Sequence, residues 1–261
     1  MINIDRKLYE KQGFVILRNI IPQKKIFSLK KAFNILSRRL LKVEYLKNEK
    51  NFLKKYVSIR KKNPKLTGFL YDSLTTSLAL QNLIFDKNIQ MNIEKVMNEK
   101  LENLSHFFRC LRIDTPQANP NELDWHQDVQ DALHSKQNQI DGLTLWAPIS
   151  EANINQGTME LCISSHLKKI NNIKFADRKK FQSQYVGIPR KFSDNYAKIQ
   201  ISAKPGDCVL MNMNTLHRSI TSFSSNAKLR LTVIARFFKY SSRHYLPGAQ
   251  RFVVSKNQNV I

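Results

Sequence analysis

The residues best suited to chemistry are a histidine and an aspartate two positions apart, His126 and Asp128, in the block Trp-His-Gln-Asp. Side chains alternate along a β-strand, so residues i and i+2 of an extended segment leave on the same face. An imidazole beside a carboxylate supplies two of the three ligands of the 2-His-1-carboxylate facial triad, which holds non-haem Fe(II) with open positions. A bare pair of this kind is more often structural than metal-binding, so the prediction depends on a third ligand.

The best candidate for the third ligand is His217, which lies 91 residues after His126. Before it comes Pro205-Gly206-Asp207, where proline suits position i+1 of a turn and glycine can take a positive φ. The apolar residues 208–211 then read as a short strand that leads to the histidine. We therefore predict that His217 joins His126 and Asp128 in one iron site.

A charged side chain also stands out in residues 229–237, a largely apolar and β-branched run that reads as a buried strand. Arg230 interrupts this run, and a charge inside a buried strand is costly unless it is paired. No acidic residue lies nearby in the sequence to pair with it. This pattern predicts that an anionic group meets Arg230 in the folded protein.

These features occur in an order that resembles the phytanoyl-CoA dioxygenase family of iron(II)/2-oxoglutarate oxygenases. The resemblance covers most of the chain and rests on residues 12–18, 125–128, 143–149, 155–158, 164–166 and 205–207, followed by His217 and Arg230. It implies a mainly β fold with flanking helices, a double-stranded β-helix (a cupin-like jelly roll). We expect one domain over residues 1–261, with a helix-rich part at about 20–100 and a jelly-roll core at about 103–240.

Periodicity in the sequence places the elements around that core. Residues 14–20 and 107–113 read as strands, and apolar positions from Ile26 to Leu40 recur at the spacing of an amphipathic helix. Residues 43–65 read as helix plus loop, and residues 73–82 and 87–98 as two further helices. Helices on the outside of the jelly roll are what the resemblance implies.

The resemblance also implies roles for individual residues. His126, Asp128 and His217 would hold Fe(II), and the guanidinium of Arg230 would bind the distal carboxylate of 2-oxoglutarate through a bidentate fork. Ser219, two residues past His217, could add a hydroxyl, and Arg112 could replace the lysine that the family usually has near this point. Thr144 and Trp146 share a strand face and would form a wall of the co-substrate pocket. The alternative for Trp146 is that it is a core aromatic.

The activity implied is oxidation of a small-molecule substrate with 2-oxoglutarate and O₂, giving succinate and CO₂. Asp128 is present where halogenating relatives have a small residue, so hydroxylation is favoured over halogenation. One alternative is a non-catalytic jelly roll that binds a ligand. Another is an oxygenase acting on a nucleic acid or a phosphorylated conjugate. The basic segment 168–203 is where the family tends to place substrate recognition, while His106, His134, His166 and His244 are interpreted as structural.

The chain is strongly basic, with a formal net charge of +23. Residues 1–100 hold 22 Lys and Arg against 8 Asp and Glu. A genome rich in A and T favours lysine, asparagine and isoleucine codons and would explain this; an anionic partner or substrate is the alternative. We prefer the codon explanation, which makes a nucleic-acid partner unlikely.

Cysteine usage and hydropathy bear on the compartment. The chain has an odd number of cysteines, the widely spaced Cys110, Cys162 and Cys208. They lie in apolar contexts and are expected to be reduced core thiols. No apolar run approaches the roughly 20 residues that span a bilayer, and the first residues lack the apolar core of a signal peptide. We expect a cytoplasmic protein without a membrane span.

Overall fold

A computed structural model describes residues 5–116, 122–128, 142–168, 174–175 and 186–240 of the chain. Its centre is an antiparallel sheet of five strands in the order β1-β8-β3-β10-β2. These strands are Phe14–Leu17, Cys208–Asn212, Gly142–Pro148, Arg230–Lys239 and Leu104–Asp114. A second sheet has the order β7-β4-β9, with strands Lys198–Gln200, Thr158–Cys162 and His217–Ile220. A short hairpin joins β5, Lys174–Phe175, to β6, Val186–Gly187.

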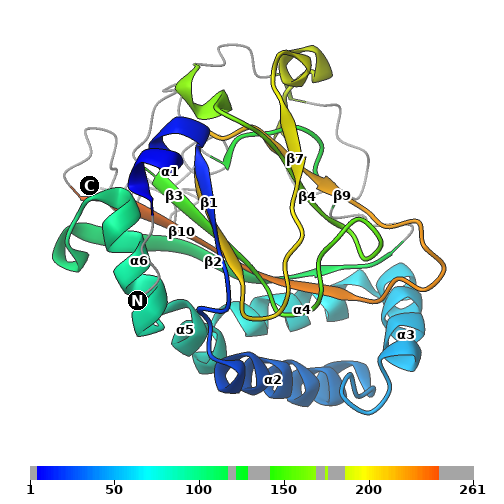
Figure 1. Cartoon of the computed structure of the whole chain (residues 1–261). Helices are drawn as coiled ribbons and strands as arrows, with labels where there is room; N and C mark the ends of the chain where they lie inside the picture. Colours follow the sequence, from blue (N-terminus) through cyan, green and yellow to red (C-terminus); the bar gives the residue numbers. More distant parts are fainter. Residues whose placement is uncertain (1–4, 117–121, 129–141, 169–173, 176–185, 241–261) are drawn as a thin grey trace, which may run out of the picture.

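The two larger sheets face one another and enclose an apolar cluster (Figure 1). This cluster takes Trp146 from β3, Val209 and Met211 from β8, and Met159 and Leu161 from β4. Two facing antiparallel sheets, with the chain passing from one sheet to the other between strands, are typical of a jelly roll. The predicted fold class, a mainly β jelly roll with flanking helices, is confirmed.

The outer face of the five-stranded sheet packs against the helices. Alternation along β10 sends Leu231, Val233 and Ala235 into this helix-side core and leaves Arg230 and Arg236 on the opposite, inner face. The helices are α1 Arg6–Gln12, α2 Gln23–Leu41, α3 Glu49–Lys62, α4 Pro64–Thr75, α5 Leu78–Ile84 and α6 Lys87–Met97. Short 3₁₀ turns follow at Leu101–Asn103, Ser165–Leu167 and Arg190–Asn195.

The longest helix, α2, forms as its sequence predicts. Ile26, Leu29 and Phe33 lie at helical spacing on its buried face, and Pro22 immediately precedes it. Figure 1 shows α2 at the bottom of the view, with α3 beside it and α4 behind it. Both α2 and α3 pack against α4, which in turn contacts β2. The helices thus brace the edge strand of the main sheet.

One helix prediction was wrong. Residues 73–82, expected as a single helix, contain the end of α4 at Thr75 and the start of α5 at Leu78. Ser77 between them has an extended backbone, with φ −60° and ψ 128°. The chain therefore turns here, because serine favours helix starts over helix interiors. Among the described residues, no helix combines the length and apolar character needed to cross a bilayer.

Candidate active site

The two histidines predicted to share a site are brought together by backbone pairing. His126 and His217 form an antiparallel β-bridge, with N–H to C=O distances of 2.9 and 3.0 Å. Ser219 N–H also donates to Leu123 C=O at 2.8 Å, so residues 123–126 run beside β9. His126 takes part only in this isolated bridge and does not belong to a strand, although the sequence had led us to expect one. Directly opposed residues share a face, so both imidazoles still point the same way.

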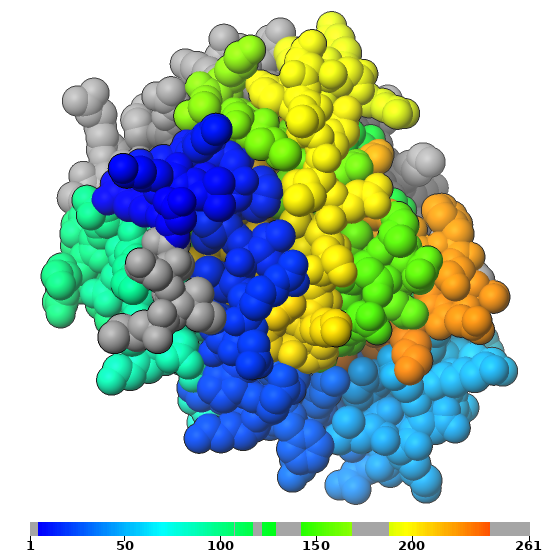
Figure 2. All heavy atoms as spheres, in the orientation of Figure 1, coloured from blue at the N-terminus to red at the C-terminus, as the bar shows by residue number. Residues whose placement is uncertain are grey.

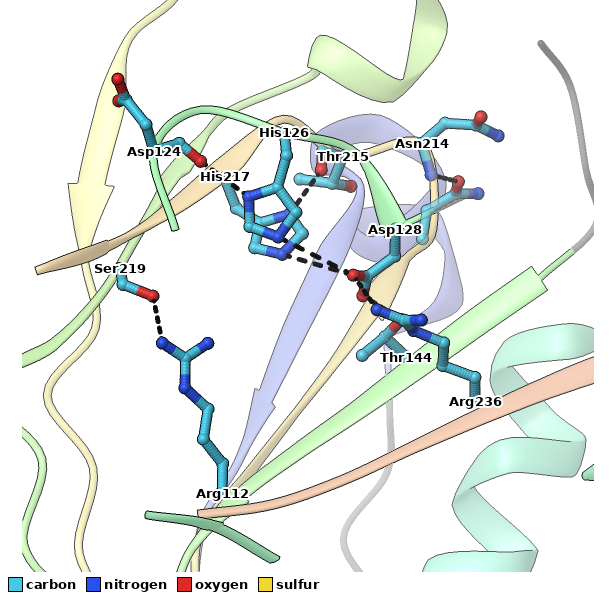
Figure 3. A network of polar contacts seen from close by, with 11 residues as sticks. Arg112, Asp124, His126, Asp128, Thr144, Asn214, Thr215, His217, Ser219 and Arg236 are labelled. Atoms are coloured by element: carbon cyan, nitrogen blue, oxygen red, sulfur yellow. Dashed lines mark hydrogen bonds and ion pairs between the residues drawn. The ribbon is translucent and has the colours of Figure 1, made fainter. Parts of the chain in front are cut away.

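Asp128 completes the group that the sequence predicted. Its Oδ1 lies 3.9 Å from His126 Nε2 and 3.8 Å from His217 Nε2 (Figure 3). One ligand atom from each of the three residues falls within 4.8 Å of the others, and all three side chains are buried. Two nitrogens and one carboxylate oxygen converging from one side are the donor set of a non-haem iron site.

The tautomer of each imidazole follows from its second nitrogen. His126 Nδ1 lies 2.7 Å from Asp124 C=O, and His217 Nδ1 lies 2.9 Å from Thr215 C=O. A carbonyl only accepts, so each Nδ1 carries the hydrogen and each Nε2 presents a lone pair toward Asp128. Burial lowers the pKa of both rings, and the neighbouring His126 helps lower that of His217 to about 4. Both rings are therefore neutral at neutral pH, as metal ligands must be.

Both carboxylate oxygens of Asp128 have hydrogen-bond donors. Arg236 Nη2 donates to Oδ1 at 2.5 Å, and Thr144 Oγ1 donates to Oδ2 at 2.6 Å. Burial alone would raise the pKa of Asp128, but Arg236 and the two histidines outweigh it and hold the pKa well below its usual range. Asp128 is therefore an anion held in one orientation. The sequence interpretation missed Arg236, although its position six residues after Arg230 puts both on the same strand face.

A second polar network lies on the same inner face. Arg230 donates to Asp114 Oδ2 from Nη2 at 2.8 Å and from Nε at 3.2 Å. Arg112 donates from Nε to Asp114 Oδ1 at 2.8 Å and from Nη2 to Ser219 Oγ at 2.9 Å. An anionic group was expected to meet Arg230, and within the chain Asp114, which is distant in sequence, does so because β2 and β10 pair the two residues directly. The network still joins the predicted residues Arg112, Ser219 and Arg230.

Buried polar atoms without partners mark the end of this network. Arg230 Nη1, Thr221 Oγ1 and Thr232 Oγ1 make no hydrogen bond to a described residue. Arg230 and Thr221 border a small cavity that Gly157 also lines. Gly157 has φ +83°, and a Cβ added there would lie 3.5 Å from Arg230 Nη1. An unpaired buried donor costs free energy, so this cradle fits an incoming carboxylate such as that of 2-oxoglutarate.

The remaining predicted residues have varied positions. Thr144 donates to Asp128 and does not point to Arg230. Trp146 packs in the apolar cluster between the sheets, which agrees with its alternative interpretation as a core aromatic. His166 contacts Glu10 C=O at 3.0 Å, and the His106 ring packs between Phe85 and Phe237. His134, His244 and most of segment 168–185 lie outside the described residues.

The sequence profile of the family described as phytanoyl-CoA dioxygenase (PhyH) matches residues 9–228. The chain belongs to the phytanoyl-CoA dioxygenase family. Its match spans the metal-ligand group and most of the jelly roll. No match was found among curated proteins.

Solved structures share the fold. The epimerase SnoN, in complex with Fe³⁺, α-ketoglutarate and nogalamycin RO, is 14% identical, with a TM-score of 0.60 over 91% of this chain and 83% of its own. EctD from S. alaskensis, with 2-oxoglutarate and 5-hydroxyectoine, is 14% identical, with a TM-score of 0.57 over 90% and 74%. EvdO2 from Micromonospora carbonacea var. aurantiaca, complexed with 2-oxoglutarate, is 13% identical, with a TM-score of 0.60 over 92% and 91%.

Membership of this family defines the enzyme class. The protein is therefore a non-haem iron(II)- and 2-oxoglutarate-dependent oxygenase. Iron and 2-oxoglutarate are its cofactor and co-substrate, in keeping with the buried His-Asp-His group.

Proposed function

We propose that this enzyme hydroxylates a small organic molecule, converting R–H, 2-oxoglutarate and O₂ into R–OH, succinate and CO₂. The observation that carries the proposal is the complete group of His126, Asp128 and His217 together with the carboxylate cradle at Arg230. A binding protein without activity would have no use for both features between the same two sheets.

In this proposal, His126 Nε2, His217 Nε2 and Asp128 Oδ1 are the iron ligands. The iron and 2-oxoglutarate, once bound, supply the oxidising power that breaks an unactivated C–H bond. The protein's part is to fix the ligands: two backbone carbonyls orient the imidazoles, while Thr144 and Arg236 hold the carboxylate. Partners of this kind typically change metal affinity or activity by 10–100-fold when removed.

Arg230 is proposed to bind the distal carboxylate of 2-oxoglutarate with Nη1, assisted by the hydroxyls of Thr221 and Thr232. Charge supports this assignment. Arg112 and Arg230 bring two positive charges, and Asp114 neutralises one of them. Arg230 Nη1 has no hydrogen-bond partner among the described residues, so it would be the donor to an incoming carboxylate.

Hydroxylation is preferred among the possible oxidations because the carboxylate ligand, Asp128, is present and both its oxygens accept hydrogen bonds. The fold alone does not choose, since it is shared with an epimerase and with a protein crystallised with 5-hydroxyectoine. The basic chain and the arginines of the inner face are compatible with an anionic substrate.

The test is a screen of a metabolite library with Fe(II), ascorbate and 2-oxoglutarate, following succinate release and product mass. We expect one substrate class to raise succinate formation and to gain a single oxygen atom. Asp128→Ala should abolish both, whereas Asp72→Ala, which removes an exposed carboxylate on α4, should leave both unchanged. Product that is desaturated, cyclised or epimerised instead of oxygenated would replace hydroxylation with that reaction.

We also propose that the protein works in the cytoplasm and that residues 1–261 form one domain. Cys110, Cys162 and Cys208 are all free and buried, which is compatible with a reducing compartment. Non-reducing gels of protein purified with and without an alkylating agent would test the thiol state. A disulfide in the protein as isolated from its cell would contradict the cytoplasmic assignment.

A further inference from the structure

The positive charge of the chain is concentrated in one segment. Residues 23–65, which form α2, α3, their connections and the first two residues of α4, hold 15 Lys and Arg and only 2 Asp and Glu. The other 218 residues hold 28 basic and 18 acidic side chains. Codon bias acts on the whole chain, so it explains a general excess of lysine but not this segregation.

The imbalance between basic and acidic side chains is greater still among the exposed residues. Within residues 23–65, all of which the structure describes, every exposed charged side chain is basic, and both acidic ones, Glu44 and Glu49, are half-buried. None of the exposed basic residues forms an ion pair with a described residue. We call these exposed residues the basic face: Lys24, Lys31, Arg38, Arg39, Lys42, Lys47, Lys50, Lys54, Lys55, Lys61, Lys62 and Lys65.

Large apolar side chains stand among these cations. Phe27, Ile35 and Leu46 are 53%, 58% and 45% exposed. On α2 the stripe Phe27, Lys31, Ile35 repeats every four residues, which places its two apolar members about 12 Å apart on one side of the helix. Lys31 lies over the Phe27 ring at 4.6 Å. The solvent side of α2 therefore carries apolar and cationic groups together.

The basic face lies away from the metal-ligand group. The buried side of α2 packs on the helix-side core, and the iron ligands lie on the other face of the main sheet. Figure 2 shows α2 and α3 adjoining across the lower part of the molecule. Binding at this surface would leave the inner face of the sheet free for catalysis.

We propose that the basic face docks the enzyme on an anionic lipid surface. Lysine and arginine near such a surface attract its negative headgroups, and exposed apolar side chains enter the boundary between headgroups and acyl chains. A nucleic acid would use the cations and could stack on Phe27, but it offers nothing to the aliphatic Ile35 and Leu46. The mixture of groups thus favours a bilayer over a nucleic acid.

The test is flotation of the full chain with vesicles of phosphatidylcholine alone or with about one third phosphatidylglycerol. We expect binding only to the anionic vesicles, and its release by high salt because salt screens exposed charges. The variant with Lys31→Glu, Arg38→Glu, Lys54→Glu and Lys61→Glu should bind at least roughly 100-fold more weakly. The matched control is Lys95→Glu, Lys100→Glu, Lys191→Glu and Lys204→Glu, which has the same net charge and should keep most of the binding.

A second pair of variants separates a bilayer from a nucleic acid. Phe27→Ser with Ile35→Ser should weaken vesicle binding about tenfold, while Leu78→Ser with Phe223→Ser, exposed apolar residues elsewhere, should not. No binding to anionic vesicles, or equal loss in the lysine control, would overturn the proposal. So would tight RNA binding that the Phe27 and Ile35 changes leave intact. None of these assays needs substrate turnover, so they are independent of the proposed hydroxylation.

Discussion

The two oxygens of Asp128 each have a donor before any metal is considered, and one of these donors is the charged Arg236. The guanidinium therefore balances the buried carboxylate in the metal-free protein. A bound divalent ion would take over much of that role. Arg236 is in this sense a positioning residue, which acts through Asp128.

The first prediction concerns Arg236→Met, which keeps the length of the side chain but removes its charge. Loss of one partner from a buried pair should lower the stability of the metal-free protein by about 3–5 kcal/mol. Cobalt(II) should then raise the melting temperature more in the variant than in the natural protein, because the ion supplies the missing positive charge. Arg6→Met, which breaks an exposed pair with Glu10, is the control and should change neither quantity much. An equal or smaller cobalt shift in Arg236→Met would contradict this role.

The second prediction concerns Arg230→Ala. Removing the proposed partner of the co-substrate carboxylate should weaken 2-oxoglutarate binding about a hundred- to a thousand-fold, which corresponds to about 3–4 kcal/mol. Arg230→Lys should recover only part of the loss, since an ammonium cannot form the bidentate fork. The measurement is an anaerobic titration of the Fe(II) protein, following the metal-to-ligand charge-transfer band. Unchanged affinity would transfer the role to Arg112.

At the scale of single residues, the sequence predicted that His126, Asp128 and His217 come together, and it missed their hydrogen-bond partners. His126, Asp128 and His217 could be chosen from residue type, spacing and family resemblance. Arg236 and Asp114 could not be assigned partners in the same way, because a contact between strands depends on register. The register here includes a shift between Arg236 and Phe237, which no local pattern reveals.

Strand β10 is the element that connects the two halves of the site. It pairs with β2 on one side and β3 on the other, so Arg230 meets Asp114 and Arg236 lies opposite Thr144. Long apolar strands and amphipathic helices were predictable because their periodicity is strong, as in α2 and α6. The turn between α4 and α5 was not, because Thr76 and Ser77 are also compatible with a continuous helix.

The pairing of β2 with β10 gives a prediction about pH. Burial alone would raise the pKa of Asp114, but Arg112 and Arg230 outweigh it and lower the pKa to about 2. The unfolded chain, with an aspartate pKa of about 3.9, takes up the proton first as the pH falls. The stabilisation is therefore present above about pH 4 and is lost toward about pH 2, and it is on the order of 2–3 kcal/mol.

Asp114→Asn removes this contribution. Urea unfolding should show the variant to be less stable at neutral pH, with a smaller further loss between about pH 4 and pH 3 than in the natural protein. Asp72→Asn, at an exposed position on α4, is the control and should keep the natural pH dependence. Parallel pH curves for Asp114→Asn and the natural protein would show that the carboxylate is not held as the structure indicates.

At the scale of the whole molecule, the two largest apolar clusters of the described residues do not include His126, Asp128 or His217. The larger cluster joins the main sheet to the helices, and the smaller one fills the space between the sheets. We therefore expect the fold to survive metal removal. After chelation the far-UV circular dichroism should stay unchanged while the melting temperature falls, since a ligand bound only by the folded state stabilises it. Loss of secondary structure on chelation would instead give the metal a structural role.

The bridge between His126 and His217 also has a consequence for the order of events during synthesis. The first histidine and Asp128 leave the ribosome 89 or more residues before the second histidine. Strands β9 and β10, which bring His217 and Arg236 to the site, are the last described strands of the chain. Contacts between distant segments form only after a long loop has closed. A nascent chain that lacks these two strands therefore has no complete iron site, and iron loading must wait until β9 and β10 have been synthesised.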